Sequence, residues 1–202
     1  MRVETLHETE QLLIETTVVG KLKNNVFIVS PKDDGPSILI DAAEPQDDIV
    51  EWARSRNVAN VLTTHNHHDH IGGIAKMRAA GIKVGIGTSD TFGTGTVDFE
   101  IEHNDSFKIA NTELIAVHPP GHTPGSTCFE LLGHNILFTG DTLFPGGPGA
   151  TRNPRDFQTI MESVDELFAR YSDDFAILPG HGKTTTFGNE RPHIESWRQR
   201  GW

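Results

Sequence analysis

A chain of 202 residues with 36% hydrophobic residues is long enough to bury a core, and we expect one domain over residues 1–202. Its formal net charge of −11 disfavours nucleic acid as a partner, because phosphate backbones are bound by clustered cations. The first residues lack the basic and apolar segments of a secretory signal, and no apolar run approaches the roughly 20 residues of a membrane span, so we expect a cytoplasmic protein without a membrane partner.

Apolar runs rich in β-branched residues predict a succession of short strands. They cover residues 12–19, 26–29, 37–40, 58–63, 82–86, 114–117, 127–131, 135–138 and 175–178. Turn residues at 23–25 separate the first two strands, and an Asp-Asp-Gly-Pro turn at 33–36 precedes the third. The single cysteine, Cys128, falls within the predicted strand 127–131, where we expect a small buried side chain and no disulfide.

Three segments follow a helical period. The first begins at Pro45, the second follows Asp69, and the third begins at Asn153 and Pro154. Their apolar faces are Ile49, Trp52 and Ala53 in the first, Ile71, Ile74, Ala75 and Met77 in the second, and Phe157, Ile160, Met161, Val164, Leu167 and Phe168 in the third. Residues 88–105 are rich in glycine and threonine and predict a loop near the site or an irregular connection. This order predicts an α+β fold in which two sheets pack together and helices cover their outer faces.

Histidines and an aspartate gather directly after the predicted strand 58–63. The chain there reads His65, Asn66, His67, His68, Asp69 and His70. A loop at the end of a strand lets such side chains converge, and polar groups that become buried need partners. Imidazole and carboxylate groups together suit zinc, iron or manganese. The sequence therefore predicts a metal site at the end of this strand.

Three further candidate ligands lie downstream, each after a predicted strand and beside a glycine. They are His122 after strand 114–117, Asp141 after strand 135–138 and His181 after strand 175–178. We expect these strand ends to meet at one edge of the fold. The complete predicted set is His65, His67, Asp69, His70, His122, Asp141 and His181. This set exceeds what one tetrahedral ion needs and matches two divalent metal ions that share a carboxylate.

At these positions the sequence resembles the metallo-β-lactamase superfamily, whose HxHxDH motif is matched at residues 65–70. The resemblance implies a four-layer αββα sandwich with the metals at one edge. It also implies that one ion is bound by His65, His67 and His122, that the other is bound by Asp69, His70 and His181, and that Asp141 bridges them. Zinc is the expected metal, with iron or manganese as alternatives.

Within that superfamily, residues 120–126, 138–144 and 179–182 are most similar to glyoxalase II, the hydroxyacylglutathione hydrolase, and its shorter relatives. This similarity implies hydrolysis of a small-molecule thioester or related ester by a metal-bridging hydroxide, with Asp69 orienting the nucleophile. Having His67 rather than glutamate favours a hydrolytic site over the diiron flavoprotein branch, and having Asp141 rather than cysteine argues against a true β-lactamase.

The chain departs from glyoxalase II in two places. Only 21 residues follow His181 (202 − 181), too few for the helical C-terminal domain, and residues 145–152 lack the family's Gly-Cys-Gly-Lys/Arg element. The identity of the thiol therefore stays open. The alternative functions are a persulfide dioxygenase with one iron on His65, His122 and Asp141, and a lactonase of the same superfamily.

Other residues are assigned more loosely. Asp41 is either an acceptor for a ligand histidine or a turn residue, and His68 is expected to point away from the metals. His118 either lines the site or has no part in it. Arg152, Arg155 and residues 187–192 are candidate substrate contacts, with a solvated loop as the alternative. Trp197 is expected to pack on the body of the protein and Trp202 to contact a partner; the oligomeric state is left open.

Overall fold

The computed structural model describes residues 1–201 and contains two large β-sheets. The first sheet has seven strands, which lie side by side in chain order. They are β1 (Val3–Glu8), β2 (Leu12–Val19), β3 (Asn24–Pro31), β4 (Ser37–Ile40), β5 (Val58–Thr63), β6 (Lys83–Gly87) and β7 (Phe99–Ile101). Strands β1 to β4 are antiparallel, whereas β4 to β7 are parallel, so the ends of β4, β5 and β6 share one edge.

The second sheet has six strands in the order β15-β14-β11-β10-β9-β8. Their bounds are β8 (Ser106–Ile109), β9 (Thr112–Val117), β10 (Cys128–Leu131), β11 (Ile136–Gly140), β14 (Ala176–Pro179) and β15 (Thr185–Thr186). Strands β11 and β14 are parallel, so the loops that follow them leave from the same edge. A short hairpin of β12 (Leu143–Phe144) and β13 (Gly147–Pro148) follows β11.

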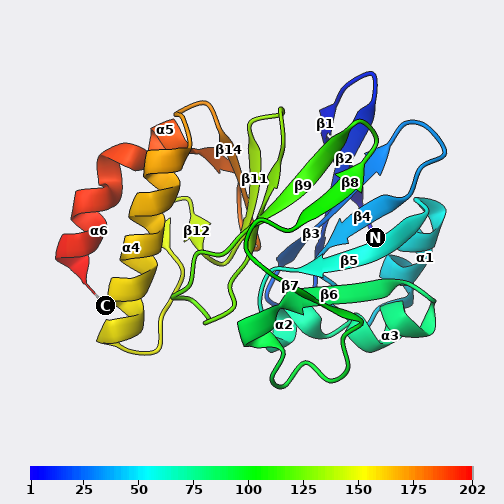
Figure 1. Ribbon diagram of the computed structural model, residues 1–202, viewed down its shortest axis with the longest axis horizontal. Coiled ribbons are helices and arrows are strands. Elements are labelled where there is room, and N and C mark those ends of the chain that lie inside the picture. Colours follow the sequence, from blue (N-terminus) through cyan, green and yellow to red (C-terminus); the bar gives the residue numbers. More distant parts are fainter. Residues whose placement is uncertain (202) are drawn as a thin grey trace.

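Helices cover the outer face of each sheet (Figure 1). On the first sheet lie α1 (Asp47–Ser55), α2 (His68–Ile71) and α3 (Ile74–Ala79), and on the second lie α4 (Pro154–Arg170), α5 (Phe187–Glu190) and α6 (Ile194–Arg200). Short 3-10 turns occupy Thr88–Asp90 and Arg191–His193. The arrangement is the αββα sandwich expected from the sequence, because each sheet buries one face on the other sheet and one on helices.

Three apolar clusters fill the spaces between these layers. The central cluster joins side chains of both sheets, among them Ile14, Phe27 and Phe138. A second cluster lies between the first sheet and its helices and contains Trp52, and a third lies under α4 and contains Trp197. Trp197 thus packs on the body of the protein as predicted, whereas Trp202 lies outside the described residues.

Several predicted elements need correction. The predicted helix after Asp69 is two short helices, α2 and α3, because Gly73 N donates to Ala42 O at 2.7 Å and a Cβ at Gly73 would meet backbone oxygens. Residues 88–105 are not wholly a loop, since they contain a 3-10 turn and strand β7. The predicted turn at 23–25 ends earlier, because Asn24 and Asn25 already belong to β3.

Candidate metal centre

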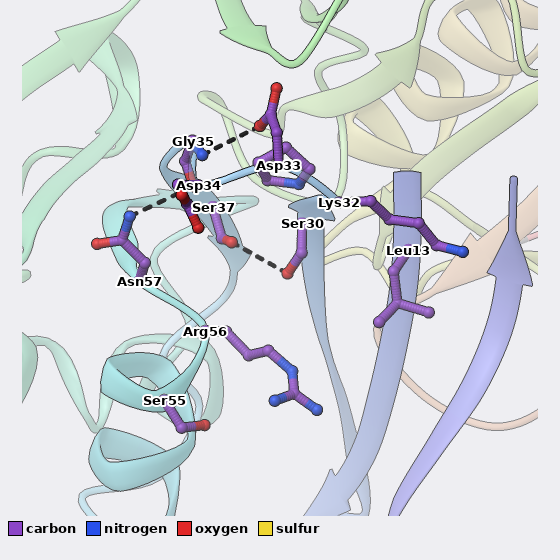
Figure 2. A pocket seen from close by; sticks show the side chains of 11 residues that line it. Leu13, Ser30, Lys32, Asp33, Asp34, Gly35, Ser37, Ser55, Arg56 and Asn57 are labelled. Carbon is purple, nitrogen blue, oxygen red and sulfur yellow. Dashed lines mark hydrogen bonds between the residues drawn. The ribbon is translucent and has the colours of Figure 1, made fainter. Parts of the chain in front are cut away.

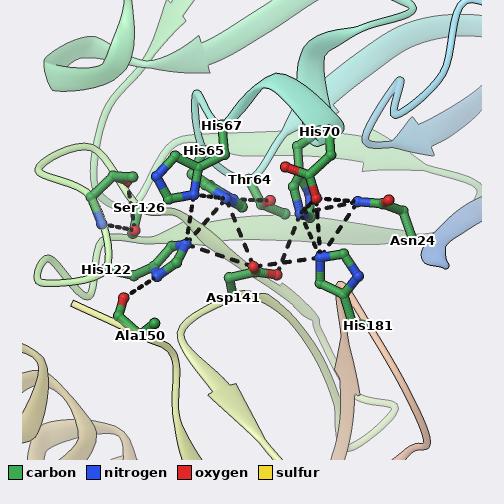
Figure 3. A network of polar contacts seen from close by, with 12 residues as sticks. Asn24, Thr64, His65, His67, His70, His122, Ser126, Asp141, Ala150 and His181 are labelled. Atoms are coloured by element: carbon green, nitrogen blue, oxygen red, sulfur yellow. Dashed lines mark hydrogen bonds and ion pairs between the residues drawn. The ribbon is translucent and has the colours of Figure 1, made fainter. Parts of the chain in front are cut away.

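The predicted ligands converge at one edge of the sandwich, where loops of both sheets face each other (Figure 3). His65 and His67 follow β5 of the first sheet, while Asp141 and His181 follow the parallel strands β11 and β14 of the second. Close approach of the two loops in the second sheet requires glycine at position 180. A Cβ there would lie 2.5 Å from Asp141 Oδ1.

Three histidines form a first cluster, which we define as His65, His67 and His122. His122 Nε2 lies 2.9 Å from His67 Nδ1 and 3.3 Å from His65 Nε2, and the latter two atoms lie 3.1 Å apart. Donor atoms bound to one zinc ion at about 2.0–2.1 Å have separations of this order. The three nitrogens therefore surround a point where one ion fits.

A second cluster consists of Asp69, His70 and His181. The Nε2 atoms of His70 and His181 lie 3.2 Å apart, and Asp69 Oδ2 lies 3.3 Å from the second of these and 3.6 Å from the first. This cluster offers one carboxylate oxygen and two imidazole nitrogens, which is a common donor set for zinc, iron or manganese.

Asp141 lies between the two clusters. Its Oδ2 is 3.6 Å from His122 Nε2 and 3.5 Å from His181 Nε2, and its Oδ1 is 3.4 Å from His70 Nε2. The Oδ1 atom is buried and forms no hydrogen bond within the described residues. A buried carboxylate oxygen needs a partner, and a cation between these side chains supplies one. The donor set thus fits a pair of divalent metal ions.

The outer nitrogens of the histidines are held by hydrogen bonds that fix their tautomers. His70 Nδ1 donates to Asp41 Oδ2 at 2.7 Å, His122 Nδ1 donates to the Ala150 carbonyl at 2.7 Å, and His181 Nδ1 donates to the Leu22 carbonyl at 3.0 Å. In each of these histidines Nε2 is then the nitrogen that faces the clusters, which is the arrangement typical of metal-binding histidines.

Burial sets the protonation states of the first cluster. It lowers the pKa of His65 well below the ordinary value and also lowers the pKa of His67 and His122, because a charged imidazole is poorly solvated there. For His70, burial is outweighed by the charges of Asp41 and Asp141, which raise its pKa to about 10. The first cluster is therefore neutral and ready to bind a cation at pH 7.

A family model described as Metallo-beta-lactamase superfamily matches residues 19–181, which include every predicted ligand. The chain belongs to the metallo-beta-lactamase superfamily. It is similar to a hydroxyacylglutathione hydrolase of Haemophilus influenzae, with 31% identity over 156 residues that cover 67% of this chain and 74% of that protein. The resemblance seen in the sequence is thereby confirmed.

Solved structures of this superfamily share the fold. The chain superposes on a metallo-beta-lactamase from Staphylococcus aureus with a TM-score of 0.80 and 22% identity, covering 94% of this chain and 63% of that one. It superposes on ETHE1 from Myxococcus xanthus with a TM-score of 0.77 and 20% identity, covering 90% and 82%. At these identities the likeness concerns the fold alone.

Two buried polar residues of the site were missed in the sequence. Asn24, at the start of β3, donates from Nδ2 to Asp69 Oδ2 at 2.9 Å. Asp90, after β6, accepts hydrogen bonds from Asn66 N, Thr123 Oγ1 and Gly125 N, and so ties together the loops that carry the first cluster. Asp90 lies in segment 88–105, which the sequence predicts as a loop near the site, and an acidic residue shortly after predicted strand 82–86 is a signal that could have found it.

The looser assignments have mixed outcomes. Asp41 accepts the hydrogen bond expected of it, and His68 points away from the clusters with 89% of its side chain exposed. Arg152 is exposed and pairs with Asp156 at 3.1 Å. For residues 187–192, neither substrate contact nor the alternative of a solvated loop holds at Phe187, which is fully buried against Phe168 of α4.

A hollow of about 580 Å³ lies at the opposite edge of the first sheet (Figure 2). It is lined by Asn57, which precedes β5, whereas the loop with the candidate ligands follows β5. Its two cations are already paired, Arg56 with Glu15 through Nε and Nη2 at 2.5 and 2.7 Å, and Lys32 with Glu8 at 2.5 Å. This hollow therefore has no connection with the candidate metal centre.

No helix within residues 1–201 is long and apolar enough to cross a membrane.

Proposed function

We propose that the protein is a binuclear metal-dependent hydrolase that cleaves a small-molecule thioester. The observation that carries the proposal is the pair of nitrogen-rich clusters with the Asp141 carboxylate between them. The first cluster would hold one ion and the second cluster the other, with Asp141 bound to both. Zinc is the first candidate, because the donors are imidazoles and carboxylates in a compact arrangement.

Two divalent ions at such a site supply a nucleophile from water at neutral pH and polarise a carbonyl oxygen. The chain's own residues keep that site in order. The neutral imidazoles of the first cluster would leave its net charge positive once an ion is bound, which favours the negative charge that develops on an attacked carbonyl oxygen. Asp69, held close to His181, would also orient the attacking water as the catalytic carboxylate.

A thioester is the proposed substrate for two reasons. The Haemophilus influenzae relative is named as a hydroxyacylglutathione hydrolase, and a hydroxyacylglutathione is a thioester. A departing thiolate also needs little help from an acid, and no dedicated general acid is identified among the described residues around the clusters. A related ester that requires no strong acid for its leaving group fits the same site.

The test combines metal analysis with a substrate panel on one preparation. We expect close to two metal ions per chain and hydrolysis of at least one thioester from a panel built on glutathione, coenzyme A and simple thiols. The variant that tests the site is Asp141→Asn. It should bind at least one ion fewer, and its kcat/KM should fall by about 100-fold or more, since metal charge contributes several kcal/mol to such reactions.

Other results would redirect the assignment. One iron per chain, with oxygen uptake and sulfite release from a glutathione persulfide, would replace the hydrolase by a persulfide dioxygenase. Cleavage of lactones in preference to all thioesters would indicate a lactonase. Metal binding without cleavage of any ester or thioester would contradict the proposed enzyme activity altogether.

A further inference from the structure

Asn24 contacts every member of the second cluster. Its side chain is fully buried, and Nδ2 lies 2.9 Å from Asp69 Oδ2, 3.3 Å from His70 Nε2 and 3.5 Å from His181 Nε2 (Figure 3). These separations match those among the three cluster atoms themselves, which run from 3.2 to 3.6 Å. The Nδ2 atom of Asn24 therefore lies as close to the three cluster atoms as they lie to one another.

The backbone holds Asn24 firmly in this place. Asn24 forms an isolated antiparallel bridge with His181, and the next residue, Asn25, donates from its backbone N to Gly180 O at 2.7 Å. The Asn25 side chain also donates to Pro179 O and Gly182 O, both at 2.9 Å. These bonds join the start of β3 to the loop that carries His181. They therefore fix the position of the Asn24 amide relative to the second cluster.

Asp69 needs such a support. It lies in α2, a single turn of helix whose N-cap residue provides no side-chain hydrogen bond. Asn24 Nδ2 donates a hydrogen bond to Asp69 Oδ2 at 2.9 Å. The same hydrogen bond restricts rotation of the carboxylate and turns Oδ2 toward His181.

The Oδ1 atom of Asn24 indicates that the role of this side chain is not packing. Asn24 Oδ1 is buried and has no hydrogen-bond partner within the described residues. Such an atom costs folding free energy, and an apolar side chain of similar size would avoid that cost. The benefit of the amide therefore lies at Nδ2, where it meets Asp69.

We propose that Asn24 is a positioning residue for the second metal ion, and that it acts by holding the Asp69 carboxylate in its binding orientation. This inference rests on the proposed metal function of the second cluster. Partners that orient metal ligands typically contribute 10–100-fold to metal affinity. Loss of the donor should therefore weaken one ion and spare the ion held by the first cluster.

The test uses two substitutions and a control in the same strand. Asn24→Leu keeps the approximate size without a donor, and Asn24→Asp keeps the shape but only accepts hydrogen bonds at neutral pH. The control, Ser30→Ala, alters a buried side chain at the far end of β3 that hydrogen-bonds Ser37 at 3.0 Å. Each full-length protein is loaded with zinc and titrated with a competing chelator, and thermal unfolding of the metal-free form is measured in parallel.

We expect two zinc ions in the wild type and in Ser30→Ala, and about 10–100-fold weaker binding of one ion in both Asn24 variants. Unchanged affinities would overturn the inference. Tighter binding in Asn24→Asp would also overturn it, because an oxygen at position 24 would then be binding the ion directly. Loss of both ions together with lower thermal stability of the metal-free form would indicate a merely structural role. A wild type that binds two ions but cleaves no thioester would refute the proposed activity and leave this inference standing.

Discussion

Asp41 shows at the residue scale how the fold orients a candidate metal ligand. Its Oδ2 accepts from His70 Nδ1 at 2.7 Å, and its Oδ1 accepts from the backbone N of Thr64 at 2.7 Å. The carboxylate thus fixes one histidine of the second cluster and the beginning of the loop that carries His65. Asp41 is not itself a predicted ligand, but its hydrogen bonds therefore determine the positions of two predicted ligands, His65 and His70.

Substitution of Asp41 tests this role. Asp41→Asn should weaken zinc binding and lower kcat/KM by about 10–100-fold, because the imidazole loses its charged partner and part of its basicity. Chelator competition and steady-state kinetics measure the two effects. A suitable control is Asp174→Asn, which removes an exposed carboxylate on the far loop before β14 and should leave both quantities unchanged. Equal metal affinity in Asp41→Asn and the wild type would argue against the role.

Cys128 gives a prediction of pH dependence. Burial raises the pKa of its thiol to about 12, because a thiolate is poorly solvated inside the second sheet. The folded thiol is therefore protonated below that pH, whereas the unfolded thiol ionises near its ordinary pKa of about 8.5. The resulting contribution to stability is complete below about pH 8.5 and is lost as the pH rises toward 12.

The measurement is the reaction of Cys128 with a chromogenic disulfide reagent at pH 8. The native protein should react at least 100-fold more slowly than the protein in guanidinium chloride, since only the thiolate attacks a disulfide. The single cysteine makes the reading unambiguous. Rapid reaction of one thiol in the native state would show that the interior around β10 opens readily.

The residues of the site divide into those that a sequence motif reveals and those that it cannot. The predicted ligands stand in short loops with histidines or glycines as neighbours, so the pattern was visible locally. Asn24 and Asp69, in contrast, are 45 positions apart and meet only because β3 begins at the edge where β5 ends. An asparagine at a predicted turn carries no local sign of that contact.

At the scale of secondary-structure elements, buried segments were predictable and edge segments were not. Strands β2, β4 and β5 have the predicted bounds, because most of their residues are buried and they are rich in apolar β-branched side chains. Strand β1 is a mostly exposed edge strand with the sequence VETLHE, and so it lacks the apolar alternation that marks a strand. Its structure depends on pairing with β2, which a local pattern does not contain.

Helix α4 offers an element-scale prediction, because its start was correctly placed at Asn153 and Pro154. The Asn153 side chain accepts hydrogen bonds from the backbone N atoms of Arg155 and Asp156, both at 3.0 Å. Asn153→Ala should therefore lower the free energy of unfolding by about 1 kcal/mol. Urea denaturation measures the change, and Gln158→Ala on the exposed face of the same helix is the control, expected within about 0.5 kcal/mol of the wild type. Equal stability of both variants would mean that the cap contributes nothing.

At the scale of the whole molecule, the candidate ligand clusters and the apolar core join the two sheets in different places. The central cluster packs Phe27 of the first sheet against Phe138 of the second, with ring centroids 5.2 Å apart. The metal clusters join loops of the same two sheets at the edge, where Asp141 from one sheet faces His70 from the other. Because the core does not depend on the clusters, we expect the sandwich to persist without metal but with lower stability.

Metal removal tests this division. Binding to the folded state stabilises it by about 4 kcal/mol when the free ion is at 1,000 times Kd, and a domain of this size changes Tm by about 2–4 °C per kcal/mol. Stripping the ions with a chelator should thus lower Tm by on the order of 10 °C while leaving the far-ultraviolet circular dichroism at 25 °C unchanged. Adding zinc back should restore Tm fully in the wild type. In Asp141→Asn it should restore Tm only partly, because this variant lacks the carboxylate that lies between the clusters. A chelated protein that is unfolded at 25 °C would show that the edge, and not the core, holds the sheets together.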